Sequence, residues 1–140
     1  MTRMEWQQLA ERWLVDAKYL LDNQRWSAAY YIAGYAVECG LKSCVLVNLA
    51  KNLGEIFEPG NLFEKPRIHD IVKLVEIAGL KDIRKLATDG NNALKQNWLA
   101  VEEWNEAVRY ANTPQREAEK LYNAIVDENN GVMQWIRGRW

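Results

Sequence analysis

The side chains of this 140-residue chain that could do chemistry stand in pairs, and the first pair is His69 and Asp70. His69 is the only histidine, and an imidazole has an unperturbed pKa near neutrality. It could therefore act as a general acid or base, or contact a phosphate. The alternative is structural: His69 would lie near the start of a helix, where Asp70 complements the helix dipole.

Arg109 and Tyr110 form a second pair, which follows Trp104 in a polar stretch. An arginine can hold a phosphate through two hydrogen bonds while a neighbouring aromatic ring stacks on a base. Alternatively, Arg109 forms an ion pair with a glutamate of the segment 102–106. His69 and Arg109 are the residues that would serve a catalytic site, because RNA cleavage without a metal needs a base and a positive charge.

Glu38 and Lys42 form a third pair, four residues apart in the most apolar part of the chain. Glutamate followed by lysine at this spacing is a favourable helix pair. One interpretation is a solvated stripe or an interface ion pair. The other is a polar patch that is kept because something binds there, since charged residues seldom enter an apolar face unpaired.

The sequence contains no Gly-rich phosphate loop, no G-x-S-x-G, no H-E-x-x-H and no CxxC motif. Cys39 and Cys44 are five residues apart on one predicted helix, so their side chains point about 140° apart and cannot bridge each other. We expect both to be small buried residues. No metal site and no cofactor is predicted, and reduced thiols favour a cytoplasmic location.

Composition indicates one globular domain over residues 1–140, with 49% hydrophobic and 26% charged residues. The net charge is -1, so no global positive field attracts nucleic acid, and any such contact would need a local patch. The longest run of apolar residues and glycine, 28–37, is about half of what a bilayer requires. We therefore expect neither secretion nor a membrane span.

Apolar residues recur at helical spacing along nearly the whole chain, and no segment has the alternation of a strand. The predicted helices cover residues 4–23, 27–52 with Ser27 as N-cap, 69–79, 82–87, 93–106, and 114–137 with Gly131 as a possible kink. The first two form an antiparallel hairpin, and the second, apolar nearly all round, is central. The fold class is an all-α, up-and-down bundle of four to five helices with a short extra helix.

The chain has 7 tryptophans and 6 tyrosines, which either fill the core or line an interface or a base-stacking surface. Residues 135–140, aromatic and basic, either pack as the end of the last helix or dock a partner. The first two helices offer more apolar area than one neighbour covers. We therefore predict a homodimer through these helices that buries at least about 1,200 Å².

The stretch from Ala28 to Lys42, AAYYIAGYAVECGLK, resembles the second-helix signature of the HEPN domain (higher eukaryotes and prokaryotes nucleotide-binding). Later segments suit the same family in order, so that the resemblance covers nearly the whole chain: residues 69–74, 78–80, 97–98, 104 with 109–110, and 135–136. The resemblance implies a small helical bundle, usually a homodimer. Many HEPN proteins accompany a nucleotidyltransferase in toxin–antitoxin or defence modules, and many others are metal-independent endoribonucleases.

The ribonucleases of the family use an arginine and a histidine about four to six residues apart, with two copies meeting across the dimer. Here no histidine follows Arg109, and Arg67 lies only two residues before His69. The leading hypothesis is thus a HEPN-like binding or interaction module that recognises a nucleotide, RNA or a nucleotidyltransferase partner. The alternatives are a ribonuclease with a rearranged site at His69 and Arg109, and a purely structural bundle. The ligand-binding candidates are Glu38, Lys42, His69, Asp70, Trp104, Arg109 and Tyr110.

Overall fold

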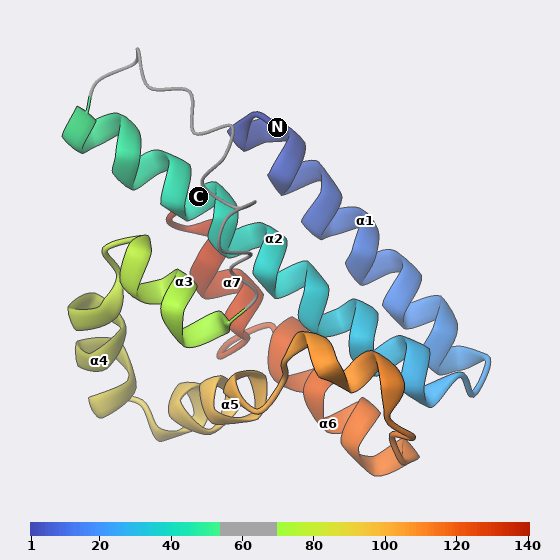
Figure 1. Ribbon diagram of the computed structural model, residues 1–140. Helices are drawn as coiled ribbons and strands as arrows, with labels where there is room; N and C mark the ends of the chain where they lie inside the picture. The colour runs from blue at the N-terminus through green and yellow to red at the C-terminus, as the bar shows by residue number, and fades with distance from the viewer. Residues whose placement is uncertain (54–69) are drawn as a thin grey trace.

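The computed structural model describes residues 1–53 and 70–140, and this described part contains no strand. Its helices, in chain order, are α1 (Arg3–Asp22), α2 (Trp26–Leu53), α3 (Ile71–Ile77), α4 (Lys81–Asp89), α5 (Asn92–Glu102), the 3₁₀ helix η1 (Glu106–Tyr110), α6 (Gln115–Val126) and α7 (Val132–Arg137). Figure 1 shows two long helices, α1 and α2, side by side. Helices α3, α6 and α7 pack against α2, whereas α4 packs against α5. The predicted all-α bundle is confirmed.

The hairpin of α1 and α2 follows from local signals at both ends of α1. At its start, the backbone N–H of Glu5 donates to Thr2 Oγ1 at 3.2 Å, and the backbone N–H of Thr2 donates to Glu5 Oε2 at 2.6 Å. This reciprocal capping satisfies two donors that a helix start leaves free. At its end, Gln24 takes a φ of 60°, which reverses the chain into α2.

Helix α2 is the centre of the fold, as its all-round apolar pattern predicts. It packs against α1, α3, α6, α7 and η1. Within the described residues it is the helix long and apolar enough to cross a membrane by length and composition, and 67% of its most apolar window is buried inside the protein. Its apolar character is therefore used in packing against its neighbours.

The prediction of one continuous helix over residues 114–137 is wrong. Helix α6 ends at Val126, and α7 begins at Val132. Between them, the side chain of Asp127 accepts hydrogen bonds from the backbone N–H groups of Asn129 and Asn130, at 3.0 and 2.6 Å. These bonds hold the intervening residues in a turn, so the chain breaks here and does not merely kink.

The start of α2 also differs from the prediction, because Ser27 is not its N-cap. The helix begins one residue earlier, at Trp26, and the backbone N–H of Ala29 donates to the carbonyl of Arg25. The Ser27 hydroxyl instead accepts a hydrogen bond from the backbone N–H of Thr113 at 2.9 Å. Ser27 therefore fixes the loop before α6 against the start of α2.

The helix predicted over residues 93–106 ends earlier, at Glu102. The Asn105 side chain then accepts a hydrogen bond from the backbone N–H of Ala107 at 2.9 Å and begins η1. The chain thus turns after α5 and places η1 against α2.

An ion pair joins the last helix, α7, to the first helix, α1. The Arg137 guanidinium donates to both carboxylate oxygens of Glu11, at 2.6 and 2.8 Å. This geometry is the two-point pairing that arginine and carboxylate favour. It fastens α7 to α1 across the bundle.

Candidate functional site

Glu38 and Lys42 form a buried ion pair on α2. The Lys42 Nζ lies 2.6 Å from Glu38 Oε1, and the two side chains are 4% and 0% exposed. The prediction that these residues lie close together is confirmed, and a solvated stripe is excluded. The Lys42 ammonium also lies 4.9 Å from the centroid of the Trp6 ring on α1, within the range of a cation–π interaction.

The ion pair continues a stripe of tyrosines along the same face of α2. Tyr31, Tyr35, Glu38 and Lys42 follow at intervals of four, three and four residues, which places them on one side of a helix. The rings of Tyr31 and Tyr35 are stacked, with centroids 6.1 Å apart and planes at 23°. Both rings are half-buried.

Two tryptophans from other segments complete this group of rings. Trp13 of α1 meets Tyr35 edge-on, with centroids 6.1 Å apart and planes at 70°. Trp104, which follows α5, packs against Tyr31 at 6.0 Å. We call the whole group the aromatic–ionic seam; its members are Trp6, Trp13, Tyr31, Tyr35, Glu38, Lys42 and Trp104.

Trp104 was predicted as a ligand-binding candidate, and the structure places it in the seam but beneath its surface. Its side chain is 1% exposed. The indole N–H groups of Trp104 and Trp13 are buried, and neither makes a hydrogen bond within residues 1–53 and 70–140. Trp104 therefore supports Tyr31 from below, whereas the half-buried tyrosines are the rings that a ligand could reach.

The seam disfavours further negative charge. Burial, followed by the neighbouring Cys39, Glu38, Tyr31 and Glu106, raises the pKa of Tyr35 to about 12. Burial and then Glu38 raise the pKa of the Cys39 thiol to about 12 as well. An uncharged aromatic group suits this surface better than a bare anion does.

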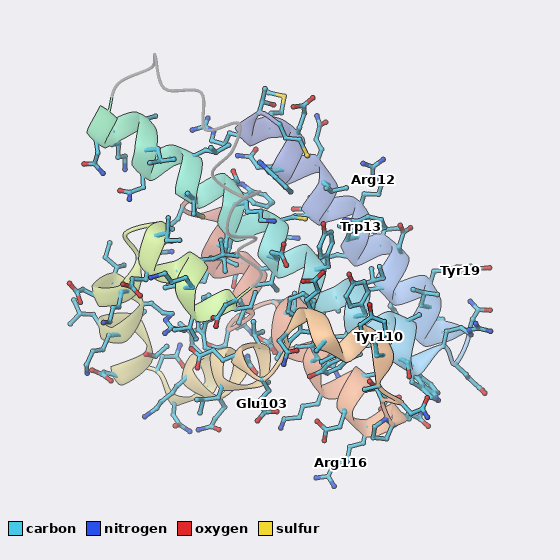
Figure 2. The ribbon with its side chains drawn as sticks, viewed as in Figure 1. Arg12, Trp13, Tyr19, Glu103, Tyr110 and Arg116 are labelled. Atoms are coloured by element: carbon cyan, nitrogen blue, oxygen red, sulfur yellow. The ribbon has the colours of Figure 1, made fainter. Side chains whose placement is uncertain are left out.

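The second predicted pair, Arg109 and Tyr110, lies in η1, which packs against α2. Tyr110 is 79% exposed, and Figure 2 shows it on η1 and Trp13 on α1, the two elements that flank this part of α2. Glu106 of η1 also contributes to the raised pKa of Tyr35. The structure thus brings η1 to the seam, whereas the side chain of Arg109 lies outside what it describes.

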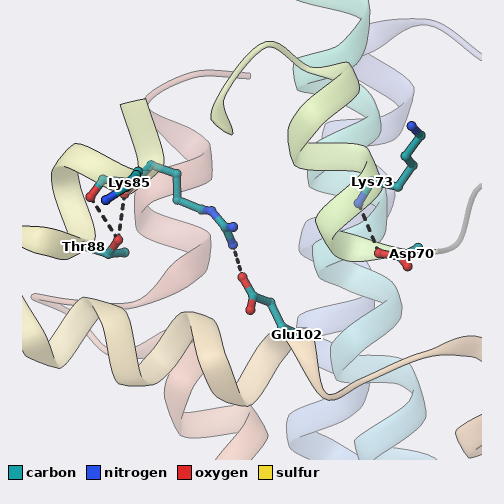
Figure 3. A network of polar contacts seen from close by, with 6 residues as sticks. Asp70, Lys73, Lys85, Thr88 and Glu102 are labelled. Atoms are coloured by element: carbon teal, nitrogen blue, oxygen red, sulfur yellow. Dashed lines mark hydrogen bonds and ion pairs between the residues drawn. The ribbon is translucent and has the colours of Figure 1, made fainter. Parts of the chain in front are cut away.

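Of the first predicted pair, His69 lies outside the described residues, whereas Asp70 lies within them. Asp70 is the N-cap of α3: its Oδ1 accepts a hydrogen bond from the backbone N–H of Lys73 at 3.1 Å (Figure 3). The interpretation of Asp70 as a helix-start residue is confirmed. The predicted pairing of His69 with Arg109 is not tested by this geometry.

A second network, which the sequence did not reveal, holds α4, α5 and α7 together. Arg84 of α4 pairs with Glu102 of α5 (Figure 3), and its guanidinium lies 4.9 Å from the centroid of the Trp98 ring. Trp98 in turn meets Trp135 edge-on at 5.6 Å. Glu102, one of the carboxylates weighed as partners of Arg109, thus pairs with Arg84.

Trp6, Trp13, Tyr31 and Tyr35 were not predicted as site residues. The signal for the tyrosines was present, because counting back from Lys42 along one helix face passes through both of them. The tryptophans depend on how α1 lies against α2, which the spacing within one helix does not contain.

Within the described residues no group of three or more His, Cys, Asp and Glu side chains could hold a metal ion. Cys39 and Cys44 are both buried and free. Comparisons with protein-family models, with curated proteins and with solved structures found no match to this chain. The resemblance to HEPN domains therefore stays a prediction.

Proposed function

We propose that this chain is a HEPN-like binding module that acts as a homodimer and recognises a nucleotide or an RNA base at the aromatic–ionic seam. The observation that carries the proposal is the Glu38–Lys42 ion pair, buried beside two half-buried tyrosine rings. A buried ion pair adds little stability compared with two apolar residues of similar volume. Its presence in the centre of the most apolar helix therefore favours a role in recognition.

The chemistry of the seam fits a base better than a phosphate. Stacking of a base on an aromatic side chain contributes about 1–3 kcal/mol and tolerates any base, because every base has a π-face. Tyr31 and Tyr35 offer half-buried rings, and Tyr110 on the adjacent η1 offers an exposed one. Glu38 and Glu106 oppose a further negative charge beside Tyr35.

Self-association is supported by the outward face of α1. Met4, Val15 and Tyr19 are 65%, 70% and 69% exposed. Their intervals of eleven and four residues place them on one side of the helix, opposite Ala10 and Ala17, which are buried. A two-fold axis lets such a surface cover itself. A nucleotidyltransferase partner is the competing occupant of this face.

The base-binding proposal is tested by titrating the protein with adenosine monophosphate and with a short single-stranded RNA. Binding is read from the tryptophan indole N–H resonances in NMR spectra. Tyr35→Leu, which removes one ring of the seam, should weaken binding by about tenfold. Tyr122→Leu is the matched control, because Tyr122 is a half-buried tyrosine of α6 outside the seam.

Equal affinity in the wild type, Tyr35→Leu and Tyr122→Leu would contradict the proposal, as would the absence of any shift at the seam. Cleavage of the RNA during the titration would instead favour the ribonuclease at His69 and Arg109. In that case a His69→Ala variant should lose the cleavage.

A further inference from the structure

A cavity of about 340 Å³ lies at the C-terminal end of α2 and is separate from the seam. Helix α2 lines it with Cys44, Val47, Asn48 and Lys51, a stripe at spacings of three, one and three residues that forms one face. This face points roughly 160° away from the tyrosine stripe of the seam. The other walls come from the turn between α3 and α4, from Ile83, and from residues 138–140.

The larger part of the cavity wall is apolar. Val47, Leu80, Ile83 and Trp140 line it. Ile83 is 48% exposed, a large apolar side chain left in part to water. The volume of the cavity is at the small end of the range of about 300–1,000 Å³ typical of small-molecule sites. Trp140 offers a flat ring for a planar group.

The cavity also carries two positive charges and no acidic side chain, since its lining contains Lys51 and Arg139 but neither Asp nor Glu. In the described part of the chain, neither Lys51 nor Arg139 belongs to an ion pair. Burial lowers the pKa of Arg139 from its ordinary value, which means that the cation is partly desolvated without a carboxylate to compensate. An anion is the group that would compensate it.

Arg139 is held in place for such a contact. Its guanidinium lies 3.7 Å from the centroid of the Trp135 ring, and Nη1 donates to the carbonyl of Trp135 at 2.8 Å. A guanidinium has five N–H donors in a fixed plane, so this one bond leaves others for a ligand. Stacking on Trp135 restricts the side chain, which reduces the entropy lost when an anion binds.

The opposite wall is also fixed before any ligand arrives. Gly79 has a φ of +71°, a conformation that favours glycine, and it ends α3 beside Asn48. The Asn48 side chain donates to the carbonyl of Ile77 at 3.0 Å, and its Oδ1 accepts from Asn52 at 2.9 Å. The turn between α3 and α4 is thereby fastened to α2.

We propose that this cavity binds a small organic anion, whose carboxylate, phosphate or sulfonate group contacts Lys51 and Arg139 and whose flat apolar body lies against Val47, Leu80 and Trp140. The proposal goes beyond base recognition at the seam. It uses different residues on the other side of α2, so either site could exist without the other.

Isothermal titration calorimetry of the full chain with 1-naphthyl phosphate tests this proposal, because this probe combines a flat apolar body with an anionic group. 1-Naphthol, which lacks the anion, should bind at least about tenfold more weakly. Arg139→Gln should weaken binding of the phosphate by about tenfold, and Lys51→Gln by severalfold. Arg116→Gln, which removes an exposed cation on α6 (Figure 2), is the matched control and should leave the affinity unchanged.

Arg139→Lys keeps the charge but loses the planar stack on Trp135, so it should weaken binding less than Arg139→Gln does, which separates loss of the anion contact from loss of the fold. Lys51 is exposed, so Lys51→Gln reports on the site even if Arg139→Gln unfolds. Affinity within twofold of the wild type in both Lys51→Gln and Arg139→Gln would overturn the proposal. Equal losses in Arg116→Gln and Arg139→Gln would overturn it as well, because they would indicate general attraction of anions to the surface.

Discussion

The indole of Trp104 occupies the space in which any side chain at position 34 would have to lie. A Cβ added to Gly34 would stand 2.3 Å from Cδ1, Cδ2 and Nε1 of that ring. Glycine inside a helix costs about 1 kcal/mol relative to alanine, yet Gly34 lies within α2. Its contact with Trp104 requires it there, because only glycine lets the ring reach Tyr31.

Gly34→Ala should therefore lower the free energy of unfolding by at least about 2 kcal/mol, because the methyl group has no room unless Trp104 moves. Urea denaturation at neutral pH measures this change in the free energy of unfolding. Gly90→Ala is the matched control: the nearest atom to a Cβ there is 3.7 Å away, so stability should change little. Equal effects of the two substitutions would show that Trp104 does not pack as described.

Removing one partner of the buried ion pair should lower the free energy of unfolding more than replacing both partners with apolar residues does. Glu38→Gln leaves the Lys42 charge in the interior without its carboxylate partner, and such losses are about 3–5 kcal/mol. In the double variant Glu38→Leu with Lys42→Met, most of this loss should be recovered, since apolar residues suit the surroundings. A double-mutant cycle of Glu38→Leu, Lys42→Met and the double variant, followed by urea denaturation, measures the coupling between the two residues.

The exposed pair of Lys18 and Asp22, with the same spacing and a distance of 2.6 Å, is the control for that cycle. Lys18→Gln should leave stability nearly unchanged, because exposed pairs are solvated and screened. If Glu38→Gln is as mild as Lys18→Gln, the Glu38–Lys42 pair is not buried in solution.

Alkaline pH should destabilise the protein through its thiols. Burial raises the pKa of Cys39 and Cys44 from the ordinary value of 9.0 to about 12. Above pH 9 the unfolded chain releases these protons while the native state retains them, so the free energy of unfolding falls as pH rises from 9 toward 12. The slope is up to about 1.4 kcal/mol per pH unit for each thiol.

Urea denaturation at pH 8, 9 and 10 checks this dependence, and Cys44→Ala should make the decline less steep. The same burial should protect both thiols of the native protein from a disulfide reagent at pH 8. Rapid labelling without denaturant would contradict the burial of Cys39 and Cys44.

Sedimentation equilibrium at micromolar concentration should give twice the chain mass of 16.3 kDa. Val15→Glu places a charge on the outward face of α1 and should raise the dissociation constant at least about tenfold, since burying an unpaired charge is costly. Leu86→Glu is the control, because Leu86 is 76% exposed on α4. A single 16.3 kDa species at all concentrations would exclude the dimer.

Asp70 should behave as a helix cap. Asp70→Ala removes the acceptor for the backbone N–H of Lys73 and should cost about 1 kcal/mol, whereas Asp70→Asn retains an acceptor and should be nearly neutral. Thermal unfolding monitored by circular dichroism measures both. A loss of nucleotide binding in Asp70→Asn at unchanged stability would instead indicate a ligand contact.

The hairpin of α1 and α2 could be predicted from sequence because each helix has its own apolar pattern and the turn between them is short. The break between α6 and α7 could not. Ile125, Val132 and Ile136 keep helical spacing across it, so the periodicity of buried residues is the same with or without the turn. The side chain of Asp127 causes the break, because it binds two backbone N–H groups that a continuous helix would use.

At the candidate site, too, the features of a single helix could be predicted, whereas those that depend on how two helices pack could not. The Glu38–Lys42 pair is a property of one helix, so its spacing predicts it. Trp6 and Trp13 enter the seam only because α1 lies against α2 in a particular register, which is a tertiary property. The pairing of Arg84 with Glu102 likewise depends on α4 packing against α5, and no spacing within either helix reveals it.

The ion pair of Glu11 with Arg137 joins positions 126 residues apart, and this has a consequence for synthesis of the chain in the cell. A ribosome releases α1 and α2 well before α6 and α7, because synthesis proceeds from the N-terminus. Until α6 and α7 emerge, the side of α2 that they cover faces water and other nascent chains. We expect the half-made polypeptide to be the form most prone to aggregation and most in need of a chaperone, until α6 and α7 pack against α2 and Arg137 reaches Glu11.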